Sequence, residues 1–102
     1  MRLLIQRVRQ ARVESGGRLL AETGAGLLVL AGFGAGDGPD LPAARVWRTL
    51  CDKVLDLRVF PDGEERLNLS LKDTAGDLML VSQFTLYADC RKGRRPSFTG
   101  AA

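Results

Sequence analysis

Three hydrogen-bonding side chains stand together in the sequence, where Ser82, Gln83 and Thr85 surround Phe84. They follow a continuous apolar run at residues 78–81, which is typical of a strand covered on both faces, although a helical segment can have the same pattern. Binding sites often form where strands end. If the strand continues, Gln83 and Thr85 lie on one face and Ser82 and Phe84 on the other. These four residues are therefore the candidate site.

A basic cluster follows a few residues later. Four cations lie within residues 91–95, and without them the chain has 11 basic against 12 acidic residues. A solvated loop would explain such a cluster, but its position beside a polar strand end favours phosphate contact. The sequence therefore predicts a site for a nucleic-acid end, with phosphates bound by Arg91, Lys92, Arg94 and Arg95.

Histidine is absent from the chain. Its absence excludes Ser-His-Asp and Cys-His nucleophile arrangements within this chain, as well as imidazole metal ligands. The two cysteines, Cys51 and Cys90, have no metal or redox spacing, and we favour free thiols over a disulfide. We therefore expect no metal and no other cofactor.

The length of 102 residues predicts a single domain spanning residues 1–102. A chain of this size buries only about 65% of its unfolded surface, so a partner subunit would stabilise it considerably. No apolar run approaches the roughly 18 residues that a membrane span needs. No signal peptide is evident, and we expect a cytoplasmic protein without membrane association.

Three strands are expected in the first third of the chain, at residues 2–14, 18–22 and 27–31. The first changes the parity of its apolar positions, which a bulge near residues 7–10 would explain. The third is a continuous apolar run, typical of a central strand. Because glycine-containing turns separate the three, we expect an antiparallel meander.

A glycine-rich segment at residues 32–40 superficially resembles a nucleotide-binding turn. Its third glycine is misplaced and no phosphate-loop lysine follows, so we interpret it as a loop. A helix should come next, with Asp40 as its cap and Pro42 in its first turn. We interpret Trp47 as the core anchor of this helix and not as a ligand-stacking ring. The apolar positions at spacings of three and four are Trp47, Leu50, Cys51, Val54 and Leu55.

The remaining segments predict a tight turn at residues 61–64, a half-exposed strand at residues 66–71 and a turn at residues 73–76. The last turn leads into the apolar strand before the candidate site. The fold class is therefore α/β of the α+β type, a mostly antiparallel sheet or partial barrel with one main helix packed on it.

With these residues in view, the chain resembles the bacterial and eukaryotic type of D-aminoacyl-tRNA deacylase over essentially its whole length. The most specific matches are residues 81–86 and 94–98, and the others are residues 4–8, 24–30, 58–60 and 67–69. The resemblance implies a homodimer that hydrolyses the ester joining a D-amino acid, or glycine mischarged on tRNA-Ala, to the tRNA acceptor end. This reaction is a proofreading step in translation.

The resemblance also assigns roles to residues. Residues 82–85 correspond to the active-site signature of the family. We expect Arg7 to contact tRNA together with the basic cluster, and the substrate pocket to include Pro96, Ser97 and Phe98.

The chain departs from the family at its C-terminal end. Family members have a second signature there, with a glycine and a cis-proline contributed across the dimer, which excludes L-amino acids. This chain ends at Ala102 without that motif, and its single Gly-Pro pair, Gly38 and Pro39, is expected to be a turn. We therefore expect a C-terminally truncated deacylase-like domain.

An aminoacyl ester is already activated, and the neighbouring ribose 2′-hydroxyl can assist attack. The protein then needs to position the ester and stabilise its oxyanion, for which the candidates are backbone N–H groups near Phe84, with Gln83 and Thr85. In the alternative mechanism Thr85 or Ser82 is a covalent nucleophile, but neither has an evident base. The competing classes are a non-catalytic tRNA- or RNA-binding module and an inactive fragment of the same fold.

Overall fold

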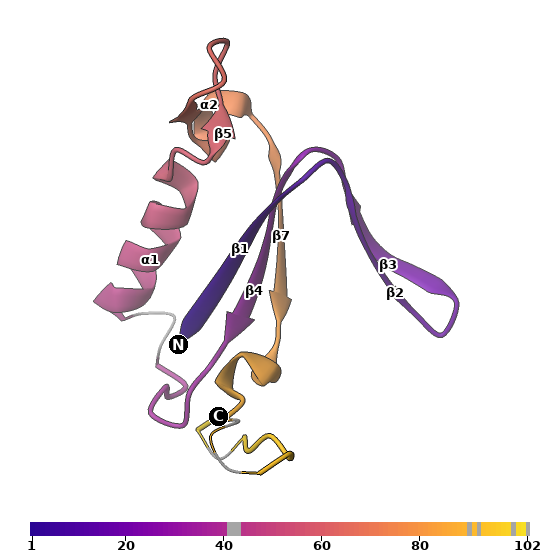
Figure 1. The fold of residues 1–102 in the computed structure, drawn as a ribbon, viewed down its shortest axis with the longest axis vertical. Helices are drawn as coiled ribbons and strands as arrows, with labels where there is room; N and C mark the ends of the chain where they lie inside the picture. The colour runs from indigo at the N-terminus through magenta and orange to yellow at the C-terminus, as the bar shows by residue number, and fades with distance from the viewer. Residues whose placement is uncertain (41–43, 90, 92, 99, 102) are drawn as a thin grey trace.

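The computed structural model describes the chain except for residues 41–43, 90, 92, 99 and 102. Its centre is a three-stranded sheet with the order β1-β4-β7, flanked on one side by helix α1, while the hairpin β2-β3 extends away on the other side (Figure 1). The elements are β1 (Arg2–Val8), β2 (Ala11–Ser15), β3 (Arg18–Thr23), β4 (Gly26–Gly32), α1 (Arg45–Asp56), β5 (Phe60–Pro61), β6 (Leu67–Leu69), α2 (Leu71–Thr74), β7 (Asp77–Ser82) and the 3₁₀ helix η2 (Phe84–Tyr87).

Strand β4 is the centre of this sheet, as its apolar run predicts. It pairs with β1 antiparallel and with β7 parallel. A strand with neighbours on both edges satisfies its backbone groups fully and can be apolar throughout. The predicted α+β class is confirmed, with sheets that are mainly antiparallel and one main helix.

The expected meander is wrong. Val8 pairs with Gly26 and Ala11 pairs with Thr23, so β1-β2 and β3-β4 form the two arms of one long hairpin that bends between the pairs. The bulge lies at Val13/Glu14 and not near residues 7–10. The apolar positions change parity at this bend, where the chain passes from the β1-β4 pair to the β2-β3 pair.

The turn of this hairpin is the one predicted. Gly16 and Gly17 have φ values of 58° and 77°, a conformation that strongly favours glycine and joins two antiparallel strands tightly. The following strand, β3, returns along β2 as expected.

Helix α1 is confirmed with its predicted apolar side, but its start is not. The N-cap is Ala44, which makes no side-chain capping hydrogen bond. Asp40 lies too early in the chain to reach the first free N–H groups of the helix, so its assignment as the cap is wrong. Pro42 lies outside the described residues.

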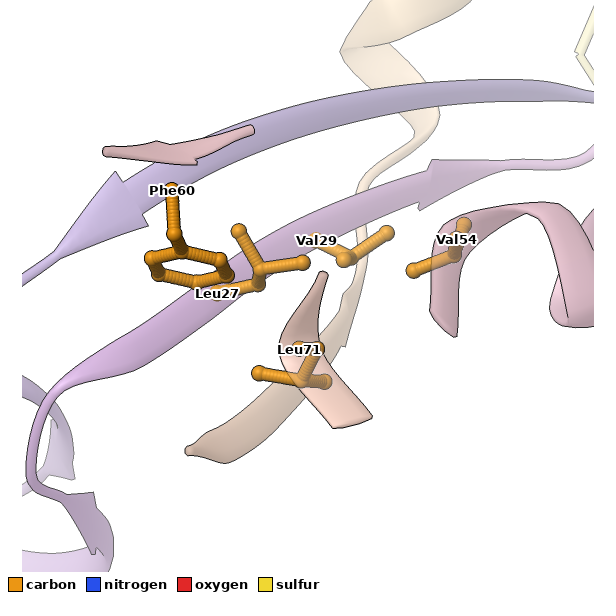
Figure 2. Close-up of a cluster of buried hydrophobic side chains, with 5 residues drawn as sticks. All are labelled: Leu27, Val29, Val54, Phe60 and Leu71. Carbon is orange, nitrogen blue, oxygen red and sulfur yellow. The ribbon is translucent and has the colours of Figure 1, made fainter. Parts of the chain in front are cut away.

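The core lies between α1, α2 and the sheet. Leu27 and Val29 of β4 are almost fully buried, and Val54, Phe60 and Leu71 gather on the same side of the strand (Figure 2). Burying side chains of this size contributes about 1.5–3 kcal/mol each, which makes this cluster the main source of stability.

Trp47 lies on the apolar side of α1 but is half-buried and outside the buried core cluster, so its predicted role as core anchor is not confirmed. Its ring centroid is 6.1 Å from that of Phe33. The ring also borders an apolar cavity of about 110 Å³ between α1 and the sheet. Cys51 is a free thiol on the same cavity. Cys90 lies outside the described residues.

The segment before β7 differs from the expected strand and turn. The strand ends at Leu69, and Ser70 caps the short helix α2. The Ser70 hydroxyl accepts from the Asp73 N–H at 3.2 Å, and the Asp73 carboxylate accepts from the Ser70 N–H at 2.9 Å. This reciprocal capping box satisfies two N–H groups at once. A helix therefore begins after Ser70, although the alternating pattern of residues 66–71 predicts a strand there. The Ser70 N–H, and then the Ser70 hydroxyl, lower the pKa of Asp73 by hydrogen-bonding with its carboxylate.

Strand β7 is confirmed, but not its expected burial. Met79 is buried, whereas Leu78 and Leu80 are 44% and 54% exposed. The strand pairs with β4 on one edge and has no partner strand on its other edge among the described residues. Its apolar composition therefore does not reflect cover on both faces in this chain. No helix within the described part of the chain is long and apolar enough to cross a membrane.

Candidate functional site

The candidate site lies where β7 ends. Gln83 is still extended, with φ −146° and ψ 100°, and its N–H donates to the Ala31 carbonyl at 2.8 Å. The chain then turns into η2 and packs over Gly32, where an added Cβ would lie 2.9 Å from the Leu86 Cβ and 3.1 Å from the Gln83 carbonyl oxygen. The strand ends at Ser82, so the condition for an alternation of side chains between two faces is not met.

The turn brings two of the predicted side chains into direct contact. The Gln83 side-chain amide donates to the Thr85 hydroxyl at 2.6 Å. Ser82 and Thr85 are exposed, and Gln83 is half-buried. The structure describes the backbone of Phe84 and not its side chain. The first N–H groups of a helical turn have no acceptor within it, so this strand end offers an amide, two hydroxyls and backbone donors.

The basic cluster folds back beside this turn. Asp89 and Ser97 exchange two backbone hydrogen bonds, of 2.7 and 2.8 Å, which return the chain towards the end of η2. The Arg91 guanidinium binds both carboxylate oxygens of Asp89, at 2.9 and 2.7 Å. This pairing lowers the pKa of Asp89 and raises that of Arg91.

A polar cavity of about 360 Å³ forms within this segment, and its lining includes two of the predicted arginines and one predicted pocket residue. The lining residues are Asp89, Arg91, Arg95 and Ser97. Arg94 and Pro96 are exposed, and Phe98 is half-buried. Lys92 lies outside the described residues. The fold thus joins the basic cluster to the predicted pocket segment.

Arg7 is not brought to this site. Arg7 of β1 pairs with Leu27 of β4, and Leu27 pairs with Leu78 of β7. Ser82 of β7 pairs with Ala31, which lies four positions further along β4. The separation along the sheet is about 13 Å. The guanidinium of Arg7 donates to the Val59 carbonyl at 2.6 Å. Its role in tRNA binding stays a prediction.

Sequence reasoning missed three residues around the site. Asp89 neutralises part of the basic cluster, Asp37 pairs with the Met1 nitrogen at 2.9 Å, and Tyr87 packs under the Arg2 guanidinium at 4.4 Å. An acidic residue two positions before Arg91 was a visible signal for the first. The contact between Asp37 and the start of the chain depends on the tertiary fold and leaves no local pattern.

Comparison with known proteins identifies the family of this chain. The family model described as D-Tyr-tRNA(Tyr) deacylase matches residues 4–102. A relative from Solidesulfovibrio magneticus named D-aminoacyl-tRNA deacylase is 61% identical over 102 residues, covering 100% of this chain and 65% of the relative. One from Nitratidesulfovibrio vulgaris with the same name is 57% identical, covering 100% of this chain and 63% of the relative.

Two solved structures share the fold. One, described as c-Myc DNA Unwinding Element Binding Protein, has a TM-score of 0.83 at 33% identity and covers 99% of this chain and 64% of its own. Another, described as a probable eukaryotic D-amino acid tRNA deacylase, has a TM-score of 0.71 at 21% identity and covers 98% and 56%.

The family match and the shared fold thus place the chain among the deacylase-type α+β proteins. The chain belongs to the D-Tyr-tRNA(Tyr) deacylase family. It spans less than two thirds of the length of these curated relatives, 65% and 63%.

Proposed function

We propose that the protein hydrolyses the ester of D-aminoacyl-tRNA, including D-tyrosyl-tRNA, and of glycyl-tRNA, releasing the free amino acid and tRNA. The observation that carries this proposal is the polar strand end at residues 82–85, which is followed along the chain by a two-arginine cavity, in a member of the deacylase family. The names of its relatives support the same reaction.

In the proposed reaction, water attacks the carbonyl carbon and the bond to the ribose 3′ oxygen breaks. The released 3′ oxygen takes one proton of the attacking water, the other proton passes to solvent, and the amino acid leaves as its carboxylate. Backbone N–H groups at the start of η2 stabilise the oxyanion, and removing one such donor typically costs about 100- to 1000-fold in rate. The substrate 2′-hydroxyl assists the attack.

The geometry favours this mechanism over a covalent threonine. The Thr85 oxygen accepts a hydrogen bond from the Gln83 amide. An amide N–H cannot take a proton from the hydroxyl, so Gln83 is not the base that a nucleophilic Thr85 would need. Gln83 instead fixes the position of Thr85 within the candidate site.

The substrate's acceptor end supplies phosphates for the basic cluster. Arg95 borders the polar cavity, and Arg94 is exposed beside it. Arg91 contributes with part of its charge offset by Asp89. We include Lys92 and Arg7 as further phosphate contacts on the basis of sequence. Because aminoacyl-tRNA serves translation, we expect the protein to act in the cytoplasm.

We also propose that the protein is a homodimer. Leu78 and Leu80 are exposed on β7, whose second edge has no partner strand within the described part of the chain. An exposed apolar strand of this kind readily pairs or packs with another molecule.

A non-catalytic tRNA- or RNA-binding module is the second candidate. It is favoured by the fact that the two-arginine cavity is formed without any residue of the candidate catalytic cluster. Phosphate binding could therefore persist without hydrolysis.

The test uses D-tyrosyl-tRNA and L-tyrosyl-tRNA, with the Solidesulfovibrio magneticus relative as the reference enzyme. Release of tyrosine and retention of uncharged tRNA on a filter are measured on the same preparations. Faster release from the D-ester supports the proposal. Saturable retention without release supports the binding module, and neither activity nor retention identifies an inactive fragment.

A further inference from the structure

The side chain of Arg2 connects the first strand of the sheet to the turn that follows the candidate site. Its Nη1 donates to the Leu86 carbonyl at 2.8 Å, and its Cζ lies 4.4 Å from the centroid of the Tyr87 ring. The start of β1 and η2 lie at the same end of the sheet (Figure 1), so residues 84 positions apart in the chain meet there. One guanidinium thus contacts two consecutive residues of η2.

The sheet makes room for this connection at Gly32. Arg2 pairs with Gly32 across the antiparallel β1-β4 pair, and side chains at two such positions share one face of the sheet. A Cβ added at Gly32 would lie 2.9 Å from the Leu86 Cβ and 3.2 Å from the Tyr87 Cδ2. Because Gly32 has no side chain, η2 packs directly on the backbone of β4 and comes within reach of Arg2.

The Leu86 carbonyl is a suitable acceptor for an arginine. The last carbonyl groups of a helical turn have no N–H partner within the turn, and a basic side chain nearby can donate to them. The planar guanidinium also stacks on aromatic faces, whereas the ammonium of lysine is a compact point charge. Since Arg2 combines both contacts in one group, lysine should replace it only in part.

The Tyr87 ring joins η2 to two further segments. A Cβ placed at Gly34, in the loop after β4, would lie 3.0 Å from the Tyr87 hydroxyl, and one placed at Gly100 would lie 3.6 Å from the ring. The Gly100 carbonyl accepts from the Ala35 N–H at 2.9 Å, which holds these two segments together. The ring that Arg2 covers is therefore where η2, this loop and the end of the predicted pocket segment meet.

We propose that Arg2 is a positioning residue for the candidate active site. By donating to the Leu86 carbonyl and covering one face of the Tyr87 ring, it fixes η2, the single turn that carries Thr85. Arg2 acts through this turn and touches neither the ester nor the attacking water. For its kinetic part alone, this inference rests on the proposed function.

One short turn separates these contacts from the candidate catalytic groups. The Leu86 N–H donates to the Gln83 carbonyl at 3.4 Å, and the Ala88 N–H donates to the Thr85 carbonyl at 3.1 Å. Gln83 and Thr85 are thus each one hydrogen bond away from the segment that Arg2 holds. A displacement of about 1 Å at the reacting groups can cost roughly 100-fold in rate, so a loosened η2 should slow the reaction.

Contact with a substrate phosphate is the competing role for Arg2, because its side chain is exposed and positively charged. The two roles predict different losses. A phosphate contact contributes to tRNA affinity and to its dependence on salt. A positioning residue contributes to the rate of the bound substrate and to the order of η2 without tRNA.

The test compares three variants with wild type. Arg2→Met keeps an unbranched side chain but removes the guanidinium, and Arg2→Lys keeps the charge without the planar group. Arg12→Met is the matched control, because it removes the same charge from an arginine whose ion pairs lie within the β2-β3 hairpin. Amide exchange is measured without tRNA, and single-turnover hydrolysis is measured with D-tyrosyl-tRNA.

In Arg2→Met the amides of Leu86 and Ala88 should exchange about tenfold faster or more, while the amides of β4 keep their protection and so report an intact fold. Arg12→Met should leave all of these amides unchanged. The single-turnover rate of Arg2→Met at saturation should fall by between about 10- and 100-fold, with tRNA affinity and its salt dependence unchanged. Arg2→Lys should recover part of both losses.

Tyr87→Leu removes the ring that Arg2 covers and shows whether the two residues act together. Adding Arg2→Met to Tyr87→Leu should slow the reaction less than Arg2→Met does in the wild-type chain, because both changes act partly through one contact. Fully independent effects of the two substitutions would contradict the proposal.

Unchanged exchange of Leu86 and Ala88 in Arg2→Met would overturn the proposal, as would faster exchange with an unchanged rate. Weaker tRNA binding with a flatter salt dependence and an unchanged rate would make Arg2 a phosphate contact instead. Loss of protection in β4 as well would make it a general stabiliser of the sheet. If wild type does not hydrolyse the ester, the proposed function fails, and the exchange measurement alone decides whether Arg2 holds η2.

Discussion

The side-chain amide of Gln83 donates to the hydroxyl of Thr85 across 2.6 Å, and this bond ties the end of the β7 segment to the first turn of η2. Gln83 is held on its other side by the hydrogen bond from its N–H to the Ala31 carbonyl at 2.8 Å. The central strand therefore fixes Gln83, and Gln83 fixes Thr85. The sheet therefore sets the positions of the two side chains in the candidate site.

Gln83→Ala should therefore lower kcat/KM for D-tyrosyl-tRNA by roughly 100-fold, because a displacement of about 1 Å at the reacting groups can cost this much. Ser82→Ala is the matched control, since Ser82 is exposed at the end of the strand and should retain substantial activity. Single-turnover rates with both variants check this prediction. Equal losses for the two substitutions would contradict it.

The basic cluster should give tRNA binding a strong dependence on salt. Each phosphate contact contributes about −0.7 to the logarithmic slope for single-stranded contacts, so alanine at all four cations should flatten it by up to about three units. Arg94→Ala/Arg95→Ala should remove about half of this change. Arg45→Ala/Arg48→Ala on α1 removes the same charge elsewhere and should leave the slope nearly unchanged. An unaltered slope in the quadruple variant would exclude the loop from the binding surface.

The start of the parallel pair β4-β7 should tolerate no side chain at Gly26. A Cβ there would overlap the Asp77 carbonyl oxygen, and both groups belong to backbone that cannot move easily. Gly26→Ala should lower the free energy of unfolding by about 3 kcal/mol or more. Gly63→Ala places its Cβ in open space and should change the free energy by less than about 0.5 kcal/mol. Urea denaturation compares them, and similar midpoints would contradict the proposed packing.

Self-association should depend on the exposed face of β7. Leu80→Lys removes the burial of a leucine, worth about 1.5–3 kcal/mol, and should weaken the dimer by about tenfold or more. Leu67→Lys on β6 is the control, because Leu67 is also exposed but lies on a different sheet. Sedimentation gives both dissociation constants. A folded wild-type monomer at high concentration would refute this interface.

Local patterns predict much of this fold because they report directly on local geometry. Residues 27–31 are apolar because β4 is central, and the three-and-four spacing from Trp47 to Val54 follows from the packed side of α1. The parity change after Val8 is equally local, but it fits a bulge and a bend alike. Only the pairing of Ala11 with Thr23 distinguishes them, and pairing depends on distant residues.

The site is predictable to the same extent. The cluster at residues 82–85 is contiguous and visible in the sequence. The residues that hold this cluster in place are distant in the sequence and cannot be predicted from it. Met1 meets Asp37, and Arg2 meets Tyr87, through the fold, and nothing near one member of either pair predicts the other. The burial of β7 was overestimated because an apolar run in the sequence does not show which other elements pack against the strand.

The most direct test of the proposed mechanism compares D-tyrosyl-tRNA with a terminal ribose against the same ester on a 2′-deoxyribose, with the amino acid attached at the 3′ position. Wild type and Thr85→Ala are measured under single-turnover conditions, with tRNA binding and folding checked for each. If the substrate 2′-hydroxyl assists attack, the deoxyribose ester should react about 100-fold more slowly or worse, and Thr85→Ala should retain substantial activity on the ribose ester. Equal rates on the two esters, with folded and tRNA-binding Thr85→Ala inactive, would contradict this account and make Thr85 the nucleophile.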